Sequence, residues 1–223
     1  MELLREKKEI TVKELCALLY LSPATARRDL SALEREGLLK RSFGGATLVE
    51  AFSDQLPLFI RSKENIQAKK RLCERGAALI ENGDTVFIDA SSTTYFLPTY
   101  FRGLRDVTVV TNNPHLSVLL SELKIRCLCT GGEMLYDSIA LVGADTLRFI
   151  DGIYADKCFF SARGYDTESG IISDSSKTER DVKIKMLENS KKKIFLCDAS
   201  KINKRYPYEI IKATDIHEVI RET

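Results

Sequence analysis

The chain of 223 residues lacks the signals that would place it in a membrane, export it or supply it with a nucleotide cofactor. It has no apolar run long enough to cross a bilayer, and its first residues lack the apolar core of a signal peptide. Neither the glycine pattern of a dinucleotide-binding turn nor that of a P-loop occurs. We therefore expect a cytoplasmic protein with no membrane partner and no cofactor.

Cysteine and histidine are too scattered to indicate a metal site or a disulfide framework. No C-x-x-C pair occurs, and the spacing is not that of a secreted scaffold. Cys127 and Cys129 would share one face of a strand, but no further ligands accompany them, and His115 and His217 are isolated. We expect no metal and six reduced cysteines in the core: Cys16, Cys73, Cys127, Cys129, Cys158 and Cys197.

The charge is nearly balanced overall but unevenly distributed. With 44% hydrophobic and 30% charged residues, the composition is that of an ordinary globular protein, and the formal net charge is +2. Residues 1–75 hold 15 Lys and Arg against 11 Asp and Glu, and the remainder holds 19 against 21. The basic excess near the N-terminus supports a nucleic-acid partner for that part of the chain.

Two capping patterns near the N-terminus predict a helix-turn-helix. Thr11 followed by Glu14 is a capping box that opens a first helix. A short turn at Tyr20 leads to a second start, where Ser22 is the N-cap and Pro23 is the first helical residue. Two capped helices joined by a tight turn form the common DNA-reading motif.

The second of these helices has one apolar face and one basic face. Ala26, Leu30 and Leu33 fall at i, i+4 and i+7, so they predict a buried face. The paired Arg27 and Arg28 project elsewhere, where they could meet base edges and phosphates. An ordinary helical hairpin with a solvated charged face would show the same arginines, so the motif needs further support.

That support comes from a predicted hairpin that follows the helix. Gly37 is expected to end the helix, and residues 38–42 and 46–49 flank a turn at Phe43-Gly44-Gly45, which predicts a basic β-hairpin wing. We therefore expect a winged helix-turn-helix that binds duplex DNA. The predicted DNA-binding residues are Ser22, Pro23, Ala24, Thr25, Arg27, Arg28, Lys40 and Arg41.

Strands and helices are predicted to alternate after a helical pattern at residues 60–81. Short apolar runs predict strands at 85–89, 107–111, 125–130, 157–160 and 193–197. Helical patterns fall at 95–101, 114–121, 145–149 and 177–189. This alternation predicts an α/β domain with a mainly parallel sheet, in which ligands bind beyond the carboxyl ends of the strands.

Polar turns follow all five predicted strands, so we expect them to form one pocket. The turn after the first strand is rich in hydroxyl groups, and its helix-start N–H groups could hold phosphate. Asp89 and Asn112 could bind sugar hydroxyls, and Lys201 and Arg163 could meet negative charge. The turns are 89–94, 111–113, 130–133, 161–164 and 198–201. They predict a small phosphorylated, hydroxyl-rich ligand.

Nearly the whole chain resembles the DeoR family of bacterial transcription regulators. Residues 22–30 together with Leu33, Gly37-Leu38-Leu39, Arg41 and 43–46 resemble the family's N-terminal signature. Further residues resemble the family's sensor domain, at 83–84, 89, 93–94, 111–112, 131–132, 141–143, 156–157, 164, 179, 198 and 200–201. Phe43 and Ser92 stand where the family often has His and Gly. The family usually has more residues before Leu3, so the resemblance implies a shortened first helix.

The resemblance implies a repressor, usually a homo-oligomer, that binds an operator in double-stranded DNA. Its C-terminal domain would be similar in fold to sugar-phosphate isomerases, and a phosphorylated sugar would be its effector. The predicted effector-binding residues are Asp89, Ser91, Ser92, Thr93, Thr94, Thr111, Asn112, Gly131, Gly132, Gly164, Glu179 and Lys201.

Three functions remain open on the sequence. The first is a regulator of sugar or carbohydrate metabolism genes without enzyme activity, with a winged helix-turn-helix at 1–50, a linker and helix at 51–75 and a sensor domain at 76–223. The second is a sugar-phosphate isomerase or deaminase with a DNA-binding segment, which would draw its acid and base from Asp89, Glu179, Asp198 and Lys201. The third is an architectural DNA binder with an inert dimerisation domain.

Overall fold

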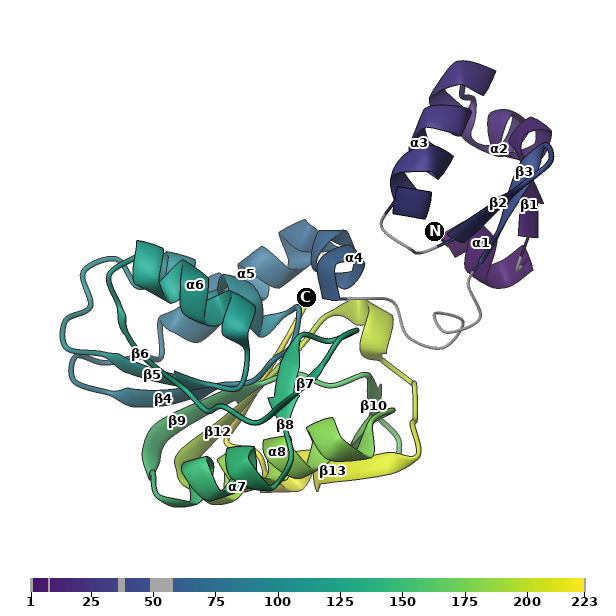
Figure 1. The fold of residues 1–223 in the computed structure, drawn as a ribbon. Helices are drawn as coiled ribbons and strands as arrows, with labels where there is room; N and C mark the ends of the chain where they lie inside the picture. Colours follow the sequence, from purple (N-terminus) through teal and green to yellow (C-terminus); the bar gives the residue numbers. More distant parts are fainter. Residues whose placement is uncertain (1, 8, 36–38, 49–57, 223) are drawn as a thin grey trace. The chain divides into compact units, whose positions relative to one another are not determined.

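The computed structural model describes residues 2–7, 9–35, 39–48 and 58–222. The chain divides into two units, Met1–Pro57 and Leu58–Thr223, and each is considered by itself (Figure 1). Gly37, the expected end of the second helix, and residues 51–57 of the expected linker and helix at 51–75 lie outside the described residues.

The N-terminal unit combines three helices with a three-stranded antiparallel sheet. The helices are α1 (Glu2–Lys7), α2 (Val12–Leu19) and α3 (Pro23–Arg35). The strands are β1 (Glu9–Thr11), β2 (Leu39–Ser42) and β3 (Gly45–Leu48), in the order β1-β3-β2. The predicted helix-turn-helix and wing are therefore confirmed, whereas β1 was not predicted. The core residues are Leu4, Ile10, Val12, Leu15, Ala26, Leu30, Leu39 and Ala46.

Local chemistry explains most of this unit. Thr11 and Glu14 form the predicted capping box of α2, and Tyr20 ends α2 in the left-handed region at φ 53°. Where β3 pairs with β1, a Cβ on Gly45 would lie 2.4 Å from the carbonyl oxygen of Ile10. Only glycine lets β3 approach β1 so closely, because any side chain would collide with backbone.

The C-terminal unit is built on a six-stranded parallel sheet of order β14-β12-β9-β4-β5-β6. Its strands are β4 (Thr85–Ile88), β5 (Thr108–Thr111), β6 (Arg126–Cys129), β9 (Ala155–Phe160), β12 (Ser190–Cys197) and β14 (Glu218–Arg221). The five predicted strands are confirmed, and β14 is a sixth strand that the sequence pattern did not reveal.

Helices cover both faces of this sheet, as Figure 1 shows. The helices are α5 (Ile66–Ala77), α6 (Pro114–Glu122), α7 (Ala144–Asp151) and α8 (Lys177–Glu188). Phe87, Phe160 and Phe195 pack towards α7 and α8, whereas their neighbours Ile88 and Phe159 pack towards α5 and α6. Because successive strand residues point to opposite faces, a sheet buried on both sides needs the continuous apolar runs seen in the sequence.

Shorter elements surround the sheet. The segments β7 (Glu133–Leu135) and β8 (Ala140–Val142) form a hairpin. The segments β10 (Gly164–Asp166), β11 (Ile171–Asp174) and β13 (Tyr208–Lys212) form a second small sheet. The 3₁₀ turns are η2 (Thr94–Tyr100), η3 (Ala199–Lys201) and η4 (Ala213–Asp215). The expected helix at 95–101 is thus a 3₁₀ segment with Pro98 inside it.

Two further expectations need correction. The helical pattern at 60–81 is two helices, α4 (Leu58–Lys63) and α5, because Asn65 adopts a left-handed conformation at φ 51° between them. All six cysteines are free, but only three lie in the core as expected: Cys73, Cys158 and Cys197. Cys16, Cys127 and Cys129 are half-buried. No helix within the described ranges has the length and apolar character that a membrane span requires.

Candidate functional site

The start of helix α3 is held by the predicted cap. The Ser22 hydroxyl accepts a hydrogen bond from the backbone N–H of Thr25 at 3.1 Å, and the Ser22 carbonyl accepts one from Ala26 at 2.9 Å. Ala26 and Leu30 are buried, as predicted, and Leu33 packs against them. The cap and the buried face together fix the helix, and its other face is left to solvent.

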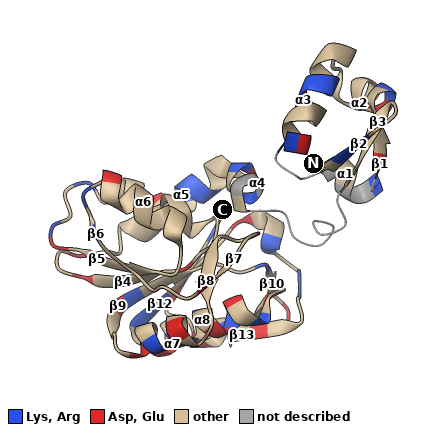
Figure 2. Cartoon of the chain, viewed as in Figure 1, with Lys and Arg blue, Asp and Glu red and all other residues tan. Residues whose placement is uncertain are grey.

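The exposed face of α3 carries the two predicted arginines. The side chain of Arg28 is 79% exposed, and its Nε lies 4.0 Å from a carboxylate oxygen of Asp29. Arg27 is also exposed. Figure 2 colours the basic residues of this unit, including those on α3 and the hairpin. A capped helix with exposed arginines near its start is the geometry that enters a major groove.

Hydrogen bonds hold the wing, which β2 and β3 form, against α3. The guanidinium of Arg41 donates a hydrogen bond to the Ser31 hydroxyl at 2.8 Å. The backbone N–H of Arg41 donates one to the carboxylate of Glu34 at 3.0 Å. Lys40 is exposed on the same strand. Phe43 is fully exposed at the tip of the hairpin, a feature that the sequence reasoning treated only as part of a turn.

In the C-terminal unit, the turn after β4 is ordered by its own side chains. The Thr94 hydroxyl donates to Oδ1 of Asp89 at 2.9 Å. The Ser91 hydroxyl accepts the backbone N–H of Thr94 at 3.2 Å. Asp89, Ser91, Ser92, Thr93 and Thr94 are all buried. The structure therefore brings these five predicted effector residues together in one compact turn.

A buried lysine neutralises Asp89. Nζ of Lys183, from α8, lies 2.7 Å from Oδ2 of Asp89 and 3.7 Å from Oδ2 of Asp174. The backbone N–H of Ser161 also donates to Oδ2 of Asp89, at 3.3 Å. Burial alone would lower the pKa of Lys183, but the carboxylates of Asp89, Asp174 and Glu179 outweigh it and the net pKa is raised. Both side-chain oxygens of Asp89 are thus occupied by hydrogen-bond donors.

A second lysine joins three of the strand ends. Nζ of Lys201 donates to the hydroxyls of Thr93 and Ser161, both at 2.6 Å. It also lies 3.0 Å from Oδ2 of Asp198. Although burial opposes ionisation, the positive charge of Lys201 holds the pKa of Asp198 at about 2. Lys201 therefore ties the turns after β4, β9 and β12 to one another, as parallel strands with polar ends predict.

Lys69 and Arg61 add positive charge from the helices that lead into the sheet. Nζ of the buried Lys69 donates to the Ser92 hydroxyl at 3.2 Å and to the backbone carbonyl of Arg61. Burial, followed by the positive charge of Lys201, lowers the pKa of Lys69 to about 8. Burial, followed by the charge of Arg163, lowers the pKa of Arg61 to about 10. Like charges are thus held close together around the Ser92 turn.

The other predicted effector residues have different surroundings. The Thr111 hydroxyl accepts the Asn113 N–H at 3.1 Å. The Asn112 amide donates to the carbonyl of Leu141 at 3.0 Å, and its buried Oδ1 has no hydrogen-bond partner among the described residues. Glu179, in the first turn of α8, is buried, and its charge acts on Lys183 and Arg61.

The predicted glycines serve close packing. A Cβ on Gly132 would lie 2.2 Å from the Thr146 hydroxyl, and a Cβ on Gly164 would lie 2.4 Å from the carbonyl oxygen of Lys204. The carbonyl of Gly131 accepts the Thr146 hydroxyl at 2.7 Å. These contacts fix the turns after β6 and β9, and no hydrogen bond among the described residues joins Gly131 or Gly132 to Lys201.

Six residues of the cluster were missing from the predicted effector-binding set. They are Arg61, Lys69, Ser161, Asp174, Lys183 and Asp198. Ser161 follows a predicted strand, so its position gave a usable signal. The lysines lie in charged helical runs, where the sequence does not distinguish a buried ammonium from a solvated one. Within the described ranges, no three His, Cys, Asp or Glu side chains gather in the way that a metal ion requires.

Two family models match the chain. The model of the DeoR-like helix-turn-helix domain matches residues 1–52, and that of the DeoR C terminal sensor domain matches residues 64–223. The HTH-type transcriptional regulator GolR of Listeria innocua is 32% identical over 99% of this chain and 87% of its own length. The HTH-type transcriptional repressor GlcR of Bacillus subtilis is 29% identical over 100% of this chain and 85% of its own length.

One solved structure shares the fold of part of this chain at low identity, and a second is less similar. The delta subunit of eIF2B from Chaetomium thermophilum has a TM-score of 0.51 and 18% identity over 73% of this chain and 58% of that one. Ribose 5-phosphate isomerase A from Methanocaldococcus jannaschii has a TM-score of 0.47 and 14% identity over 62% of this chain and 55% of that one. The chain thus spans little more than half of these solved chains. Because both family models match and the relatives cover nearly its whole length, the chain belongs to the DeoR family of DNA-binding transcription regulators.

Proposed function

We propose that this protein is a cytoplasmic repressor of sugar or carbohydrate metabolism genes, and that a phosphorylated sugar bound in its sensor domain controls it. The observation that carries the effector proposal is the buried Lys69, which donates to the Ser92 turn beside Lys201 and Arg61. Among the described residues no carboxylate lies within ion-pair distance of the buried Lys69, so an anion beside the Ser92 turn would offset the cost of burying this ammonium. A phosphate dianion is a ligand of that charge and size.

The surrounding groups suit a sugar attached to that phosphate. The turn at 91–94 offers hydroxyls and backbone N–H groups, which are common phosphate ligands. The Oδ1 atom of Asn112 is a buried acceptor without a partner in the described chain, so a sugar hydroxyl could supply its hydrogen bond. A ligand whose hydroxyl groups donate to Asn112 and whose phosphate lies beside Lys69 would be a polyhydroxylated monophosphate.

The N-terminal unit would deliver the response to DNA. Thr25, Arg27 and Arg28 would meet base edges or nearby phosphates in the major groove. Lys40 and Arg41, on the wing, would contact phosphates and so position the protein without reading much sequence. Helix α3 starts at Ser22, Pro23 and Ala24, and the backbone of these residues would approach the phosphates of the DNA.

Binding, without turnover, is the activity that the contacts of Asp89 favour. A general base needs a free lone pair within reach of the substrate proton. Oδ1 of Asp89 accepts the Thr94 hydroxyl, and Oδ2 faces Lys183 and the N–H of Ser161. A carboxylate held in this way serves as a fixed acceptor. We infer that the protein is not an enzyme.

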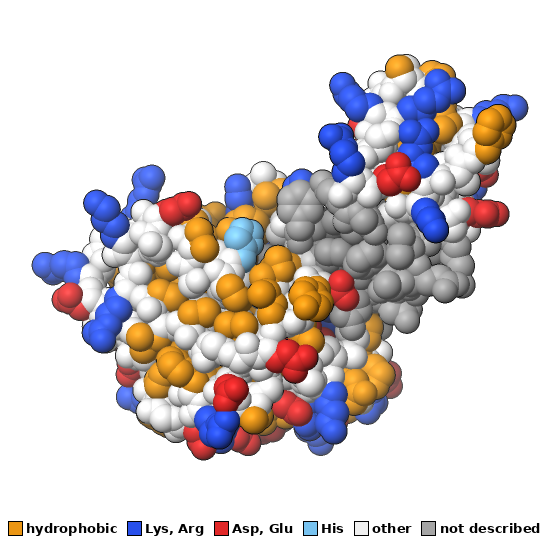
Figure 3. All heavy atoms as spheres, viewed as in Figure 1, with side chains coloured by type: hydrophobic (Ala, Val, Ile, Leu, Met, Phe, Trp, Pro, Cys, Tyr) orange, Lys and Arg blue, Asp and Glu red, His pale blue; other side chains and the backbone are white. Residues whose placement is uncertain are grey.

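A homo-oligomer is the assembly that we propose for DNA binding, because helix-turn-helix proteins commonly read two half-sites as symmetric dimers. Exposed apolar side chains support self-association. Figure 3 shows hydrophobic side chains gathered on one face of the C-terminal unit. The exposed large hydrophobic residues of this unit include Val118, Leu123, Met134, Tyr136 and Phe149. Light scattering of the purified protein would test the proposal, and a monomer at micromolar concentration would contradict it.

The effector proposal can be tested with a panel of pentose, hexose and hexosamine phosphates. A ligand at 100 times its dissociation constant raises the free energy of unfolding by about 2.7 kcal/mol, which a thermal-shift assay detects. We expect at least one sugar phosphate to stabilise the protein, its unphosphorylated sugar to have no effect, and operator affinity to change with the phosphate present. Lys69→Met should abolish the stabilisation, while Lys70→Met, its neighbour on α5, should retain it.

A catalytic protein would give a different result. Conversion of a sugar phosphate by purified protein, lost in Asp89→Asn, would replace the proposal with the isomerase alternative. If no phosphorylated sugar shifts the unfolding temperature while DNA binding is normal, the sensor proposal fails and an architectural DNA binder is favoured.

A further inference from the structure

The wing ends in an aromatic ring that faces solvent. Phe43 is fully exposed, and no other large hydrophobic side chain of the described residues is as exposed. It forms the turn between β2 and β3 together with Gly44, whose φ is 85°. The ring takes no part in the core of the N-terminal unit. An aromatic ring left in water forgoes the free energy that burial would give, so this position suits contact with a partner.

Hydrogen bonds on both sides of the turn hold this ring in place. The carbonyl of Gly44 accepts the backbone N–H of Val12, the first residue of α2, at 2.8 Å. Gly45, the next residue, pairs with Thr11 in β1. On the other side of the turn, Arg41 is bonded to α3. A rigid tip loses little conformational freedom on binding, so its contacts contribute more fully to affinity.

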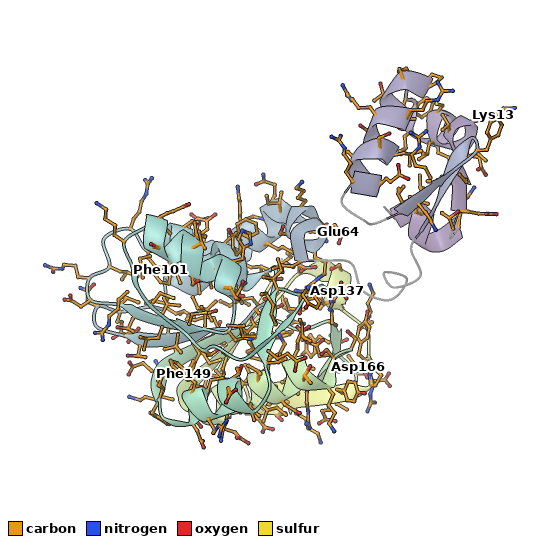
Figure 4. All side chains as sticks on the ribbon, viewed as in Figure 1. Lys13, Glu64, Phe101, Asp137, Phe149 and Asp166 are labelled. Atoms are coloured by element: carbon orange, nitrogen blue, oxygen red, sulfur yellow. The ribbon has the colours of Figure 1, made fainter. Side chains whose placement is uncertain are left out.

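Two exposed lysines belong to the elements that meet at the tip of the wing. Lys40 is on β2, and Lys13, labelled in Figure 4, follows Val12 in the first turn of α2. Glu14, in the same turn of α2, takes part in the capping box and faces Lys7 at 3.3 Å. A partner that offers negative charge beside a gap for an apolar ring matches this surface. Duplex DNA offers both, because phosphates border each of its grooves.

The size of the grooves indicates which one the ring would meet. A helix with its side chains is about 10–12 Å across, so α3 would fill a major groove of about 12 Å. Arg41 bonds to Ser31 and Glu34 in the second half of α3, so the wing would lie beside that groove, over the phosphates and the next minor groove. A minor groove about 6 Å wide excludes a hairpin but admits a side chain. Apolar side chains inserted there act as wedges between base pairs.

We propose that Phe43 enters the minor groove next to the major groove that α3 reads, with Lys13 and Lys40 on nearby phosphates. This role rests on the placement of α3 proposed above. In the minor groove a G·C pair carries an amino group that an A·T pair lacks, so the ring favours A·T pairs where it enters. The wing thereby adds a sequence preference outside the base pairs that α3 contacts.

DNA affinity of the full-length protein tests the wedge, with a duplex that the wild type selects from a random library. Phe43→Ser should weaken binding about tenfold or more, as expected for the loss of a buried aromatic contact. The slope of log affinity against log salt should not change, because no cation is lost, whereas Lys13→Ala should reduce it by about 1. Phe43→Trp should retain affinity. Tyr154→Ser, which removes a 70% exposed ring from the C-terminal unit, is the matched control and should bind as the wild type.

Replacement of single base pairs beside the selected site would locate the ring. Each pair would be changed to G·C and then to inosine·cytosine, which keeps the major-groove edge of G·C and lacks the minor-groove amino group. We expect one or two positions at which G·C weakens wild-type binding and inosine·cytosine restores it. Phe43→Ser should be indifferent to these changes. Its unfolding temperature should equal that of the wild type, because the ring is exposed.

Arg28→Ala separates failure of the wedge from failure of the DNA interface. If Arg28→Ala weakens binding and Phe43→Ser does not, the wedge is wrong and the role of α3 stands. If neither variant weakens binding, the placement of α3 is wrong and the wedge with it. A loss in Phe43→Ser without recovery on inosine·cytosine would put the ring outside the minor groove and overturn the wedge. A smaller particle mass for Phe43→Ser in light scattering without DNA would show that the ring packs against a second copy of the chain, which would also overturn it.

Discussion

Nζ of Lys183 lies 2.7 Å from Oδ2 of Asp89, and the two side chains are 5% and 1% exposed. The pair joins α8 to the end of β4, at the start of the turn at 89–94. The ammonium also faces Asp174 at 3.7 Å, so a single lysine balances two buried carboxylates. This arrangement fixes the position of Asp89 at the centre of the proposed effector site.

Loss of this lysine should be severe. Lys183→Met leaves Asp89 and Asp174 buried without a counter-ion, and breaking a buried pair typically costs about 3–5 kcal/mol. Urea unfolding would measure the effect. Lys185→Met on the same helix is the control, because its partner Asp151 is 63% exposed and such pairs contribute about 0–1 kcal/mol. Similar losses in the two variants would show that the Lys183 pair is not a special contributor.

Anion affinity should decrease as the pH rises through about 8, the pKa of Lys69. The anion needs the ammonium form, and a phosphate monoester is already mostly a dianion above its second pKa of about 6. The other charges that act on Lys69 come from Lys201, Asp198, Arg61 and Glu64. Calorimetry between pH 6.5 and 9.5 should detect proton uptake on binding.

The stability of the protein without ligand should change with pH in the opposite direction to anion affinity. Because folding lowers the pKa of Lys69 from 10.5, the unfolded chain binds more protons between about pH 8 and 10.5, and the Lys69 contribution to stability rises with pH there. Lys69→Gln should remove both effects, while Lys70→Gln should keep them. A proton uptake that persists in Lys69→Gln would assign the titration to another group.

DNA affinity should depend on the exposed arginines of α3. Arg28→Ala should weaken operator binding by about 1–3 kcal/mol if the guanidinium contacts a guanine, and relax specificity at that base pair. Fluorescence anisotropy across a salt series would measure the effect. Arg35→Ala should have a much smaller effect because Arg35 lies in the last turn of the helix, away from the start that carries Thr25, Arg27 and Arg28. Equal losses in the two variants would point to general charge as the cause.

Gly45 should be required for the wing. Gly45→Ala places a Cβ 2.4 Å from the carbonyl of Ile10, so β1 and β3 must separate. Overpacking of this kind costs about 1–3 kcal/mol. Hydrogen exchange across residues 9–11 should accelerate, and DNA affinity should fall with it. Gly44→Asn is the matched control, since a Cβ there meets nothing within 4 Å and asparagine accepts positive φ. Normal protection of β1 in Gly45→Ala would contradict the steric account.

The sequence predicted the N-terminal unit well because its signals are local. Thr11 with Glu14 and Ser22 with Pro23 satisfy backbone groups only a few residues away, so their spacing defines the helix starts directly. The sequence did not predict β1, because this strand is three residues long and pairs with β3, far along the chain. A strand that short carries no recognisable period.

The C-terminal unit shows where local signals stop. The five apolar strands were predictable because a sheet covered on both faces needs continuous apolar runs. The edge strand β14 mixes Glu218 and Arg221 with two apolar residues, so its pattern is indistinct. The helical pattern at 60–81 concealed the turn at Asn65, because neither Gly nor Pro marks that position.

The amino-acid sequence by itself determined the DNA-reading motif, the alternating α/β order and the polar turns at the strand ends, because each depends on residues close together in the chain. The tertiary structure alone decided which charges meet there. Lys69 and Lys183 look like ordinary helical lysines in sequence, yet they are buried beside Ser92 and Asp89. The physical reason is that the order of strands in the sheet, which local propensity does not encode, determines which helix faces cover the turn.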